Sequence, residues 1–225
     1  MSPATSGADG MGDRRFQFGA DLPIGSIPAG ANVLVEGTSV DGTGDLLDRM
    51  LTSGRAPGEA AVLVSTDGST ASAGRRFEGA QNVGVVCCGA GPDDGTGEGL
   101  AASSVASPGD LTGIGIQFSK VTDAVSVGGG SVRVGVDSVS TLLVYVEDPR
   151  SVFRFLHAFT GRVAAMGALG LFAIDPAAHD DRTLAMVRGP FDGRVRVRTG
   201  DRGPELRVSG LAGQPDGWER FRLED

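Results

Sequence analysis

Residues 32–50 read NVLVEGTSVDGTGDLLDRM, and this stretch decides the fold of the chain. Its apolar residues 33–35 are typical of a short buried strand. The glycine-rich residues 37–44 come next. Apolar side chains then recur at helical spacing, at Leu46, Leu47, Met50 and Leu51. The stretch therefore predicts a strand, a glycine-rich loop and a helix in immediate succession.

A strand, a glycine loop and a helix together form the layout of a phosphate-binding loop. Gly37 and Gly42 have the spacing of the two glycines in the motif G-x-x-x-x-G-K-[ST]. The motif continues with a Lys that reaches the phosphates and a Ser or Thr that binds Mg²⁺. Thr43 and Gly44 stand at these two positions. The sequence thus has the frame of a nucleotide site without its main cation.

The length and composition indicate one folded domain. The chain has 225 residues, of which 40% are hydrophobic, enough to build a sizeable core. Residues 1–12 consist mainly of Gly, Ser, Ala and Asp, and we expect a disordered tail there. Residues 13–225 are expected to form a single domain, because no shift in composition marks a second one. Within it, residues 89–109 are predicted to be a flexible connection.

Acidic residues dominate the charge of the chain. The formal net charge is −8 and the pI is about 4.8, while Lys120 is the only lysine in the sequence. A surface rich in carboxylates and poor in lysine stays hydrated at high salt. We interpret this as a halophile's protein; GC-rich coding is the alternative, although it does not explain the excess of acids. The acidic balance argues against nonspecific binding of nucleic acid.

The sequence favours a cytoplasmic location without contact with a membrane. The N-terminus has no apolar segment of the signal-peptide type, and no apolar run reaches the length of a transmembrane helix. Cys87 and Cys88 are adjacent, so on a strand they point to opposite faces, and a disulfide between them would be strained. We expect two buried, reduced thiols and no metal site built on them.

Strands and helices alternate along the chain. Further buried strands are predicted at residues 60–65, 83–88, 132–137 and 169–174. Later helices are predicted at residues 69–77, 110–125, 148–163 and 180–187. Apolar and polar residues then alternate, as in half-exposed antiparallel strands, at residues 191–198, 205–211 and 218–223. The pattern predicts an α/β domain with a mainly parallel central sheet and C-terminal antiparallel strands.

A carboxylate follows one of the predicted strands, at the edge where parallel sheets bind ligands. The run VRVGVDS at residues 132–138 is a buried strand that ends on Asp137. Phosphate-loop folds need such a strand, because its Asp holds Mg²⁺. Asp67 and Asp175 also follow strands and could converge on the loop, although roles as solvated turn and cap residues explain these two better.

Three motifs in this order resemble the RecA superfamily, in particular the KaiC-like ATPases of archaea. They are LPIGSIPAGANVLVEGTSVDGTGDLL at residues 22–47, VRVGVDSVSTLL at 132–143, and FDGRVRVR with ELRVSGL at 191–198 and 205–211. The resemblance covers roughly residues 20–211. It implies a RecA-like phosphate-loop domain with three layers, αβα, and the composition is similar to that of the haloarchaeal branch.

The departures from the family pattern point to a lost activity. Thr43 stands where the family has its phosphate-binding Lys, and Gly44 where it has the hydroxyl that binds Mg²⁺. Asp41 and Asp45 add negative charge that opposes the phosphates of a nucleotide. Asp45 can itself occupy the favourable anion position at the helix N-terminus. At most one acid, Asp67, remains where the family often has a catalytic Glu pair.

The resemblance places a vestigial nucleotide site at seven positions, which are Gly37, Thr38, Ser39, Gly42, Thr43, Gly44 and Asp137. We expect no catalytic residue, no metal and no cofactor; the alternative is a site that holds ATP and Mg²⁺. His157, in an apolar helix, and His179, on a loop, are weak candidates because neither has a paired nucleophile. The arginine stripe at residues 194–198 is either a solvated strand face or a subunit interface.

Three functions are compatible with this sequence. The first is an inactivated ATPase domain that acts as a regulatory or signal-transduction module through a protein partner or self-association. The second is an active ATPase whose missing cation comes from Arg49 or from a neighbouring subunit, because the sequence does not place Lys120 at the loop. The third is a structural subunit of a ring or filament. No specific nucleic acid is expected as a partner.

Overall fold

The protein is described from a computed structural model, which covers residues 14–66, 68, 70–89, 100–126 and 129–222. The predicted tail at residues 1–12, Asp67 and much of the predicted flexible connection lie outside the described residues. Among the described residues, no helix is both long enough and apolar enough to cross a membrane.

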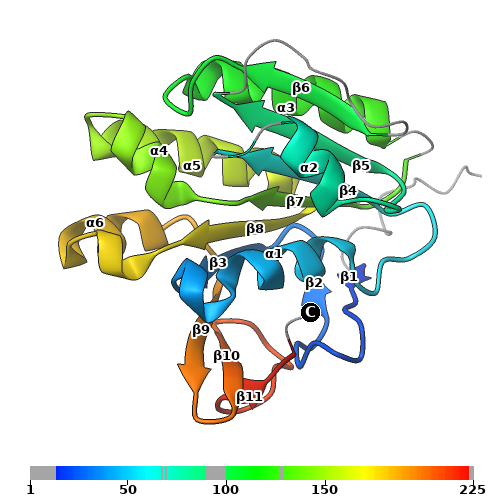
Figure 1. The fold of residues 1–225 in the computed structure, drawn as a ribbon, viewed down its shortest axis with the longest axis vertical. Helices are drawn as coiled ribbons and strands as arrows, with labels where there is room; N and C mark the ends of the chain where they lie inside the picture. Colours follow the sequence, from blue (N-terminus) through cyan, green and yellow to red (C-terminus); the bar gives the residue numbers. More distant parts are fainter. Residues whose placement is uncertain (1–13, 67, 69, 90–99, 127–128, 223–225) are drawn as a thin grey trace, which may run out of the picture.

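A nine-stranded sheet forms the centre of the molecule, in the order β11-β10-β9-β3-β8-β7-β4-β5-β6 (Figure 1). The strands from β3 to β6 in this order, and β9 beside β3, are all paired in parallel, whereas β10 and β11 are antiparallel. The bounds are β3 Asn32–Glu36, β4 Ala60–Ser65, β5 Val83–Cys88, β6 Ala101–Val105, β7 Val132–Val136, β8 Leu169–Ile174, β9 Gly193–Gly200, β10 Gly203–Ser209 and β11 Glu219–Arg220. A separate two-stranded sheet pairs β1 Arg15–Phe16 with β2 Ile27–Pro28.

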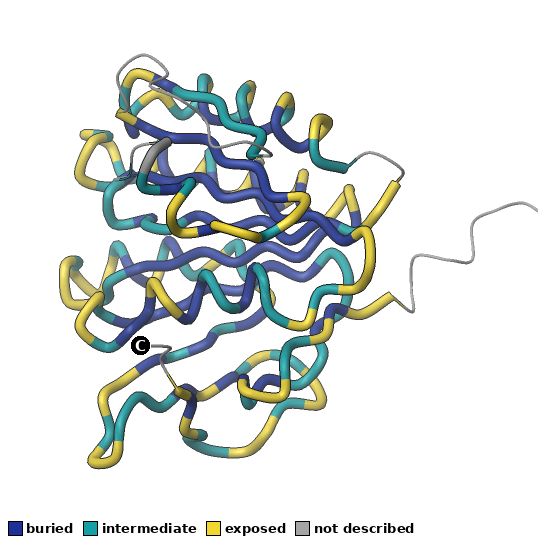
Figure 2. Tube along the Cα trace, turned by 45° about the vertical axis from the view of Figure 1, so that its right-hand side comes forward, coloured by how far each residue is buried: buried dark blue, intermediate teal, exposed yellow. Residues whose placement is uncertain are grey.

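Helices cover the two faces of the sheet. The α-helices are α1 Thr43–Thr52, α2 Thr70–Arg76, α3 Leu111–Val125, α4 Val139–Tyr145, α5 Pro149–Ala165 and α6 Asp181–Arg188; the 3-10 helices are η1 Ser39–Asp41 and η2 Pro176–Ala178. Side chains of α1 and α2 belong to one hydrophobic core, and those of α3, α4, α5 and α6 belong to the other. Figure 2 shows the buried strands between these two covered faces. The result is the expected three-layer α/β architecture, which confirms the predicted fold class.

The strands and helices predicted from hydrophobic periodicity form close to the expected bounds. Asp110 caps α3 as expected, since its side chain accepts a hydrogen bond from the backbone N–H of Gly113 at 2.8 Å. Two details differ. Residues 101–105, within the predicted connection, form β6, because they pair in parallel with β5 at the edge of the sheet. Residues 139–145, which lie outside the predicted helices, form α4, and Ser138 caps the N-terminus of this helix.

The vicinal cysteines behave as the sequence predicts. Both are buried, and neither forms a disulfide. Cys87 belongs to the core on one face of β5 and Cys88 to the core on the other. Burial raises the pKa of the Cys88 thiol to about 12, with Asp137 and Cys87 adding to the effect.

Arg133, the second residue of β7, carries a buried charge that the sequence pattern does not predict. Its side chain has no exposed surface and forms an ion pair with Glu59 at 2.5 Å. Three more N–H groups of the guanidinium donate to backbone carbonyls, those of Met50, Ser53 and Gln17. Because all three nitrogens are engaged, the charge ties the N-terminal segment and α1 to the start of β7.

Candidate functional site

The predicted phosphate loop joins β3 to α1 at the carboxyl edge of the sheet. Residues Ser39–Asp41 form the short 3-10 helix η1, which Thr38 caps. Gly42 then adopts a left-handed conformation with φ of 81°, and α1 begins at Thr43. Only glycine takes this φ without strain, so the second glycine of the motif sets the turn into the helix.

Thr43, which replaces the phosphate-binding Lys, closes the loop on itself. Its side chain is buried, and its hydroxyl donates a 2.8 Å hydrogen bond to the carbonyl of Thr38. The first glycine is packed against this hydroxyl, since a Cβ at Gly37 would lie 2.5 Å from Thr43 Oγ1. By contrast, a Cβ at Gly44 would meet no atom within 4 Å. The Lys position is therefore filled from inside the loop, whereas the Mg²⁺-hydroxyl position is open.

Asp41 holds the loop in place as an acceptor. Its carboxylate accepts hydrogen bonds from the Thr38 hydroxyl at 2.7 Å and from the Thr199 hydroxyl and N–H at 2.7 and 2.9 Å. The bonds from Thr38 and Thr199 lower the pKa of Asp41 below its ordinary value. The loop is thus tied to the end of β9 by its own carboxylate. Asp45 is exposed in the first turn of α1, where the helix dipole favours an anion.

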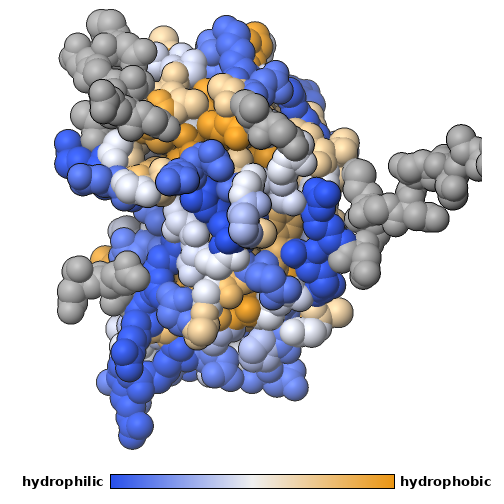
Figure 3. All heavy atoms as spheres, turned by 90° about the vertical axis from the view of Figure 1, so that its right-hand side faces the viewer, coloured by the Kyte–Doolittle hydropathy of each residue, from blue (hydrophilic) through white to orange (hydrophobic). Residues whose placement is uncertain are grey.

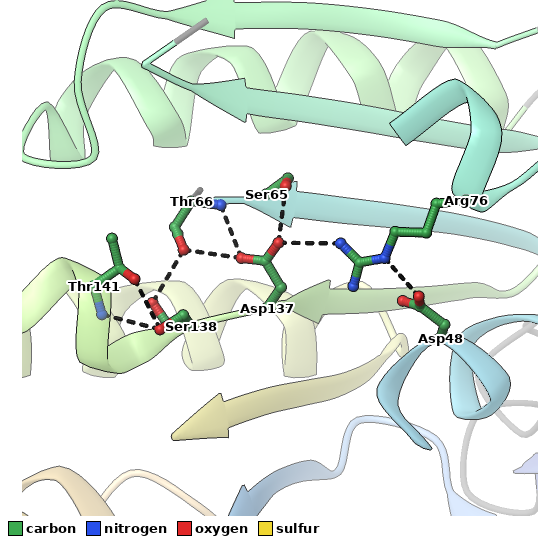
Figure 4. Close-up of polar contacts among 7 residues, drawn as sticks. All are labelled: Asp48, Ser65, Thr66, Arg76, Asp137, Ser138 and Thr141. Atoms are coloured by element: carbon green, nitrogen blue, oxygen red, sulfur yellow. Dashed lines mark hydrogen bonds and ion pairs between the residues drawn. The ribbon is translucent and has the colours of Figure 1, made fainter. Parts of the chain in front are cut away.

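Asp137 lies just past the end of β7, and its carboxylate is fully engaged by the protein (Figure 4). Ser65 Oγ donates to one oxygen at 2.8 Å, while the N–H and hydroxyl of Thr66 donate to the other at 2.8 and 2.9 Å. Arg76 adds an ion pair at 3.3 Å. The carboxylate at the expected Mg²⁺-binding position is therefore satisfied without a metal.

Arg76 on α2 is the cation that sequence reasoning missed. Its guanidinium bridges two carboxylates, with Nε 2.5 Å from Asp48 Oδ2 on α1 and Nη1 3.3 Å from Asp137 Oδ2 (Figure 4). Burial works against the charged form of Arg76, but these carboxylates outweigh it and raise its pKa. Burial also raises the pKa of Asp48, which Arg76 partly offsets. No motif pointed to Arg76, because only the packing of α2 against β5 brings it to this edge.

A cavity of about 430 Å³ opens where these groups meet. Five of the predicted site residues line it, namely Gly37, Ser39, Thr43, Gly44 and Asp137. Thr38 and Gly42 shape the loop but do not line the cavity. Its other lining residues are Arg76, Ser138, Ser140, Ala173, Ile174, Asp175 and Ala178. The structure therefore brings the loop and the end of β7 together around one cavity.

The two cations considered from the sequence lie elsewhere. Arg49 is ion-paired with Asp21 of the N-terminal segment and does not line the cavity. Lys120 is exposed on α3, which packs on the opposite face of the sheet from α1. Neither residue supplies the missing charge within this chain. Arg76 does lie at the cavity, so the expectation that named Arg49 is corrected in favour of Arg76.

The histidines also differ from expectation in one respect. His179 does contact a hydroxyl, since its Nε2 lies 2.8 Å from Ser140 Oγ at the rim of the cavity. The same Ser140 oxygen accepts the backbone N–H of Asp175 at 3.1 Å. These bonds tie the end of β8 to α4. His157 is exposed on α5 and stacks against Phe153.

The donor set does not fit the magnesium ion that phosphate-loop folds employ. Both oxygens of Asp137 already accept from protein donors, and Gly44 has no hydroxyl to offer. Across the described ranges, no group of three or more His, Cys, Asp or Glu side chains is placed to hold a metal. The cavity is instead lined by the guanidinium of Arg76, which bridges two carboxylates, and by several hydroxyl groups.

The profile of a family described as "Family of unknown function (DUF7504)" matches residues 30–197, which is well over half of the chain. The chain belongs to the DUF7504 family. In the comparison with curated proteins, no match to this chain was found.

Among solved structures, this DUF7504 protein is similar to the KaiC-like protein PH0186 from the hyperthermophilic archaeon Pyrococcus horikoshii OT3. The TM-score is 0.64 at 14% sequence identity, and the match covers 94% of this chain and 92% of that one. At this identity the likeness concerns the fold, which is therefore RecA/KaiC-like. The resemblance predicted from the three motifs is confirmed at that level.

Proposed function

We propose that this DUF7504 protein is a RecA/KaiC-like domain that no longer hydrolyses ATP and acts as a regulatory or signal-transduction module. One observation carries the proposal. Asp137, the residue that would hold Mg²⁺, is instead bonded to Ser65, Thr66 and Arg76. A guanidinium that bridges Asp48 and Asp137 occupies the place of the divalent cation and offsets part of the negative charge that would attract one.

The loop supports the same conclusion. In an active phosphate loop, backbone N–H groups cradle the phosphates and the Lys neutralises them. Here the side chain at the Lys position is a buried Thr43, and Asp41 adds a carboxylate whose lowered pKa keeps it ionised. At short range and high effective dielectric, each such charge opposes a phosphate by about 1 kcal/mol or more. The fold is retained, and the interactions that favour a bound nucleotide are replaced by interactions within the protein.

What remains for such a domain is binding to other proteins. We propose a protein partner or self-association in the cytoplasm of a halophile, in keeping with the net charge of −8. If the protein self-associates, it would act as a subunit of a ring or filament. Light scattering with and without nucleotide separates an assembling subunit from a monomeric adaptor, since assembly of the RecA type would raise the molecular mass that light scattering measures.

A second candidate function is supported by one specific observation. Arg76 lines the cavity at the phosphate loop, so a cation is available there within the chain. If Arg76 left Asp48 and Asp137, it could pair with a phosphate group, and the protein would be an ATPase with a substituted cation. This release would leave two carboxylates without their shared partner, which is why we favour the inactive form.

ATP turnover separates the two functions. Purified protein in molar KCl should release no phosphate from ATP above a blank without protein, in either monomeric or assembled fractions. Asp137→Ala and Arg76→Gln provide the matched variants. Turnover that both substitutions abolish would overturn the proposal and establish the ATPase.

A further inference from the structure

The outer side of the C-terminal strands carries a concentration of arginine. Along β9 and β10, the side chains of Val195, Val197, Leu206 and Val208 belong to the hydrophobic core. Their neighbours point to the opposite side, because successive residues on a strand alternate between faces. This outer side, here called the arginine face, consists of Arg194, Arg196 and Arg198 on β9, Glu205 and Arg207 on β10, and Trp218 and Arg220 at β11.

The arginine face projects from the end of the sheet. In Figure 1, β9, β10 and β11 extend below the layer of helices. The view in Figure 3 is turned about the vertical axis, so its lower end corresponds to these strands, and that end is mostly hydrophilic. Arg198 and Arg194 are 51% and 42% exposed, and Arg207 and Arg220 are exposed as well. The face is therefore accessible on a single chain.

The positive charges of this face are only partly balanced. Arg198 pairs with Glu205 at 2.8 Å, which uses the one carboxylate on the face. Glu36 on β3 is 4.0 Å from Arg194, but its stronger bond is to Arg188 on α6 at 2.6 Å. Arg196 and Arg207 are left with no ion pair among the described residues.

Arg196 is the strongest pointer to a ligand. Its Nε is buried and has no hydrogen-bond partner within the described structure. In the register of the sheet, Arg196 lies between Arg207 on β10 and Glu36 on β3, but the Glu36 carboxylate bonds to Arg188 and forms no ion pair with Arg196 in the described structure. Like charges directly opposite one another destabilise a sheet, and a buried donor without an acceptor costs free energy. An anion placed between the two guanidinium groups would relieve both costs.

Trp218 sets the orientation of these groups. The guanidinium carbon of Arg198 lies 4.0 Å from the centre of the Trp218 ring, and that of Arg196 lies 5.7 Å away. Stacking holds a guanidinium by its flat face and leaves its N–H edge available for a carboxylate. Since Arg198 already covers the indole, the ring is a poor platform for a nucleic-acid base, which binds by the same kind of stacking.

We propose that the arginine face binds a carboxylate-rich segment of a partner protein. Guanidinium forks match carboxylates in bidentate geometry, and such bonds remain useful at high salt because they are short and directional. The chain as a whole carries a net charge of −8, which disfavours a long polyanion such as nucleic acid over a short acidic segment. This inference rests on the interaction role in the proposed function and names the surface for it.

The protein contains its own reporter for this test. Trp218 is the single tryptophan of the chain, so its fluorescence reports directly on the arginine face. We would titrate the protein with a synthetic peptide of alternating Glu and Asp, at increasing KCl. The peptide should change the Trp218 emission in a saturable manner. Arg207→Gln should weaken binding about tenfold, the loss expected for a charge-assisted hydrogen bond.

The control is Arg150→Gln, which removes the same charge from an exposed position on α5. It should leave peptide affinity within about twofold of the parent. Arg207→Gln and Arg150→Gln both replace exposed side chains, so circular dichroism should show unchanged folding. Arg196→Lys, which keeps the charge but loses the buried Nε donor, is a second test of the arginine face. No saturable emission change, equal weakening by the control, or tighter binding of a single-stranded oligonucleotide would overturn the proposal.

The result can be separated from the fate of the nucleotide site. Peptide binding together with ATP turnover would contradict the proposed loss of ATP hydrolysis but support the proposed binding role of the arginine face. Absence of both would contradict the binding role of the arginine face but support the loss of ATP hydrolysis.

Discussion

Strand β7 has an ion pair at each end, and the two pairs differ in their surroundings. Near its start, Arg133 is fully buried with Glu59 and donates to three backbone carbonyls. Just past its end, Asp137 meets Arg76 beside a cavity, and the side chain of Arg76 is 28% exposed. The first pair joins segments of the fold. The second occupies the position of a metal site without requiring a metal.

This difference supports the proposed function, in which a ligand site loses its ligand while the fold is kept. Both pairs satisfy carboxylates with arginine, but only the second uses residues that the motif assigns to ligand binding. Thr43 and Asp41 do the same for the loop, since each bonds to Thr38. The carboxyl edge of the sheet thus keeps the layout of a phosphate site, while its polar groups bind one another.

The largest effect is expected from breaking the buried pair. Arg133→Met should destabilise the protein by about 3–5 kcal/mol, because it leaves Glu59 charged and buried without a partner. Chemical denaturation measures the loss. The double variant Arg133→Met/Glu59→Leu should recover much of it, and Arg150→Met on the exposed surface serves as the control. An Arg133→Met loss below about 1 kcal/mol would show that the pair is not a structural tie.

A smaller effect is expected at the other end of β7. Asp137→Asn should cost about 1–3 kcal/mol, since the amide can accept some of the bonds from Ser65 and Thr66 but cannot attract Arg76 as strongly. The free energy of unfolding should be unchanged by added Mg²⁺ in both the parent and the variant. A stabilisation by Mg²⁺ that the parent shows and Asp137→Asn lacks would reveal a working metal site.

Arg76→Gln should have a still smaller effect on stability, about 1 kcal/mol or less, because the guanidinium is partly exposed and its ion pairs are screened by water. Its effect on the cavity should be larger than its effect on the fold. Asp48 and Asp137 then lose their shared cation, so weak binding of a divalent cation should appear in calorimetry. A variant that unfolds outright would place Arg76 with Arg133 as a structural residue.

The smallest effects concern the dependence of stability on pH. The pKa of Asp41 is lowered from its ordinary 3.8, so its contribution is present above that value and is lost as the pH falls through the folded pKa. The pKa of Asp48 is raised, so the folded state binds its proton first and gains stability as the pH falls toward 3.8. Carboxyl carbon NMR during a titration should show Asp41 below and Asp48 above the ordinary value. The opposite order would contradict the hydrogen bonds assigned to the loop.

Much of the fold could be predicted from hydrophobic periodicity, because β3, β4, β5, β7 and β8 are continuous buried runs, β9 and β10 alternate between buried and more exposed residues, and the longer helices show an apolar stripe. The residues of the loop and Asp137 could be predicted as well, since glycine spacing and a strand that ends in a carboxylate are local patterns. Residues 101–105 were mistaken for part of a connection because β6 consists mainly of small, half-buried residues and is defined by its pairing with β5.

The remaining features depend on contacts between distant segments. Arg76 follows Ser65 and Thr66 by about ten residues, yet only the packing of α2 aims it at Asp48 and Asp137. The contact of His179 with Ser140 likewise joins the turn after β8 to α4. No local pattern encodes such meetings, so the sequence showed that the usual cation was absent but not which residue replaced it.

Calorimetry of ATP binding in molar KCl, with and without Mg²⁺, tests the central claim most directly. The restored variant Thr43→Lys/Gly44→Thr is the control for sensitivity, because the position of Gly44 has space for a side chain. The account predicts no saturable, Mg²⁺-dependent heat for the natural protein. Stoichiometric, Mg²⁺-dependent binding of ATP that Asp137→Ala removes would contradict it.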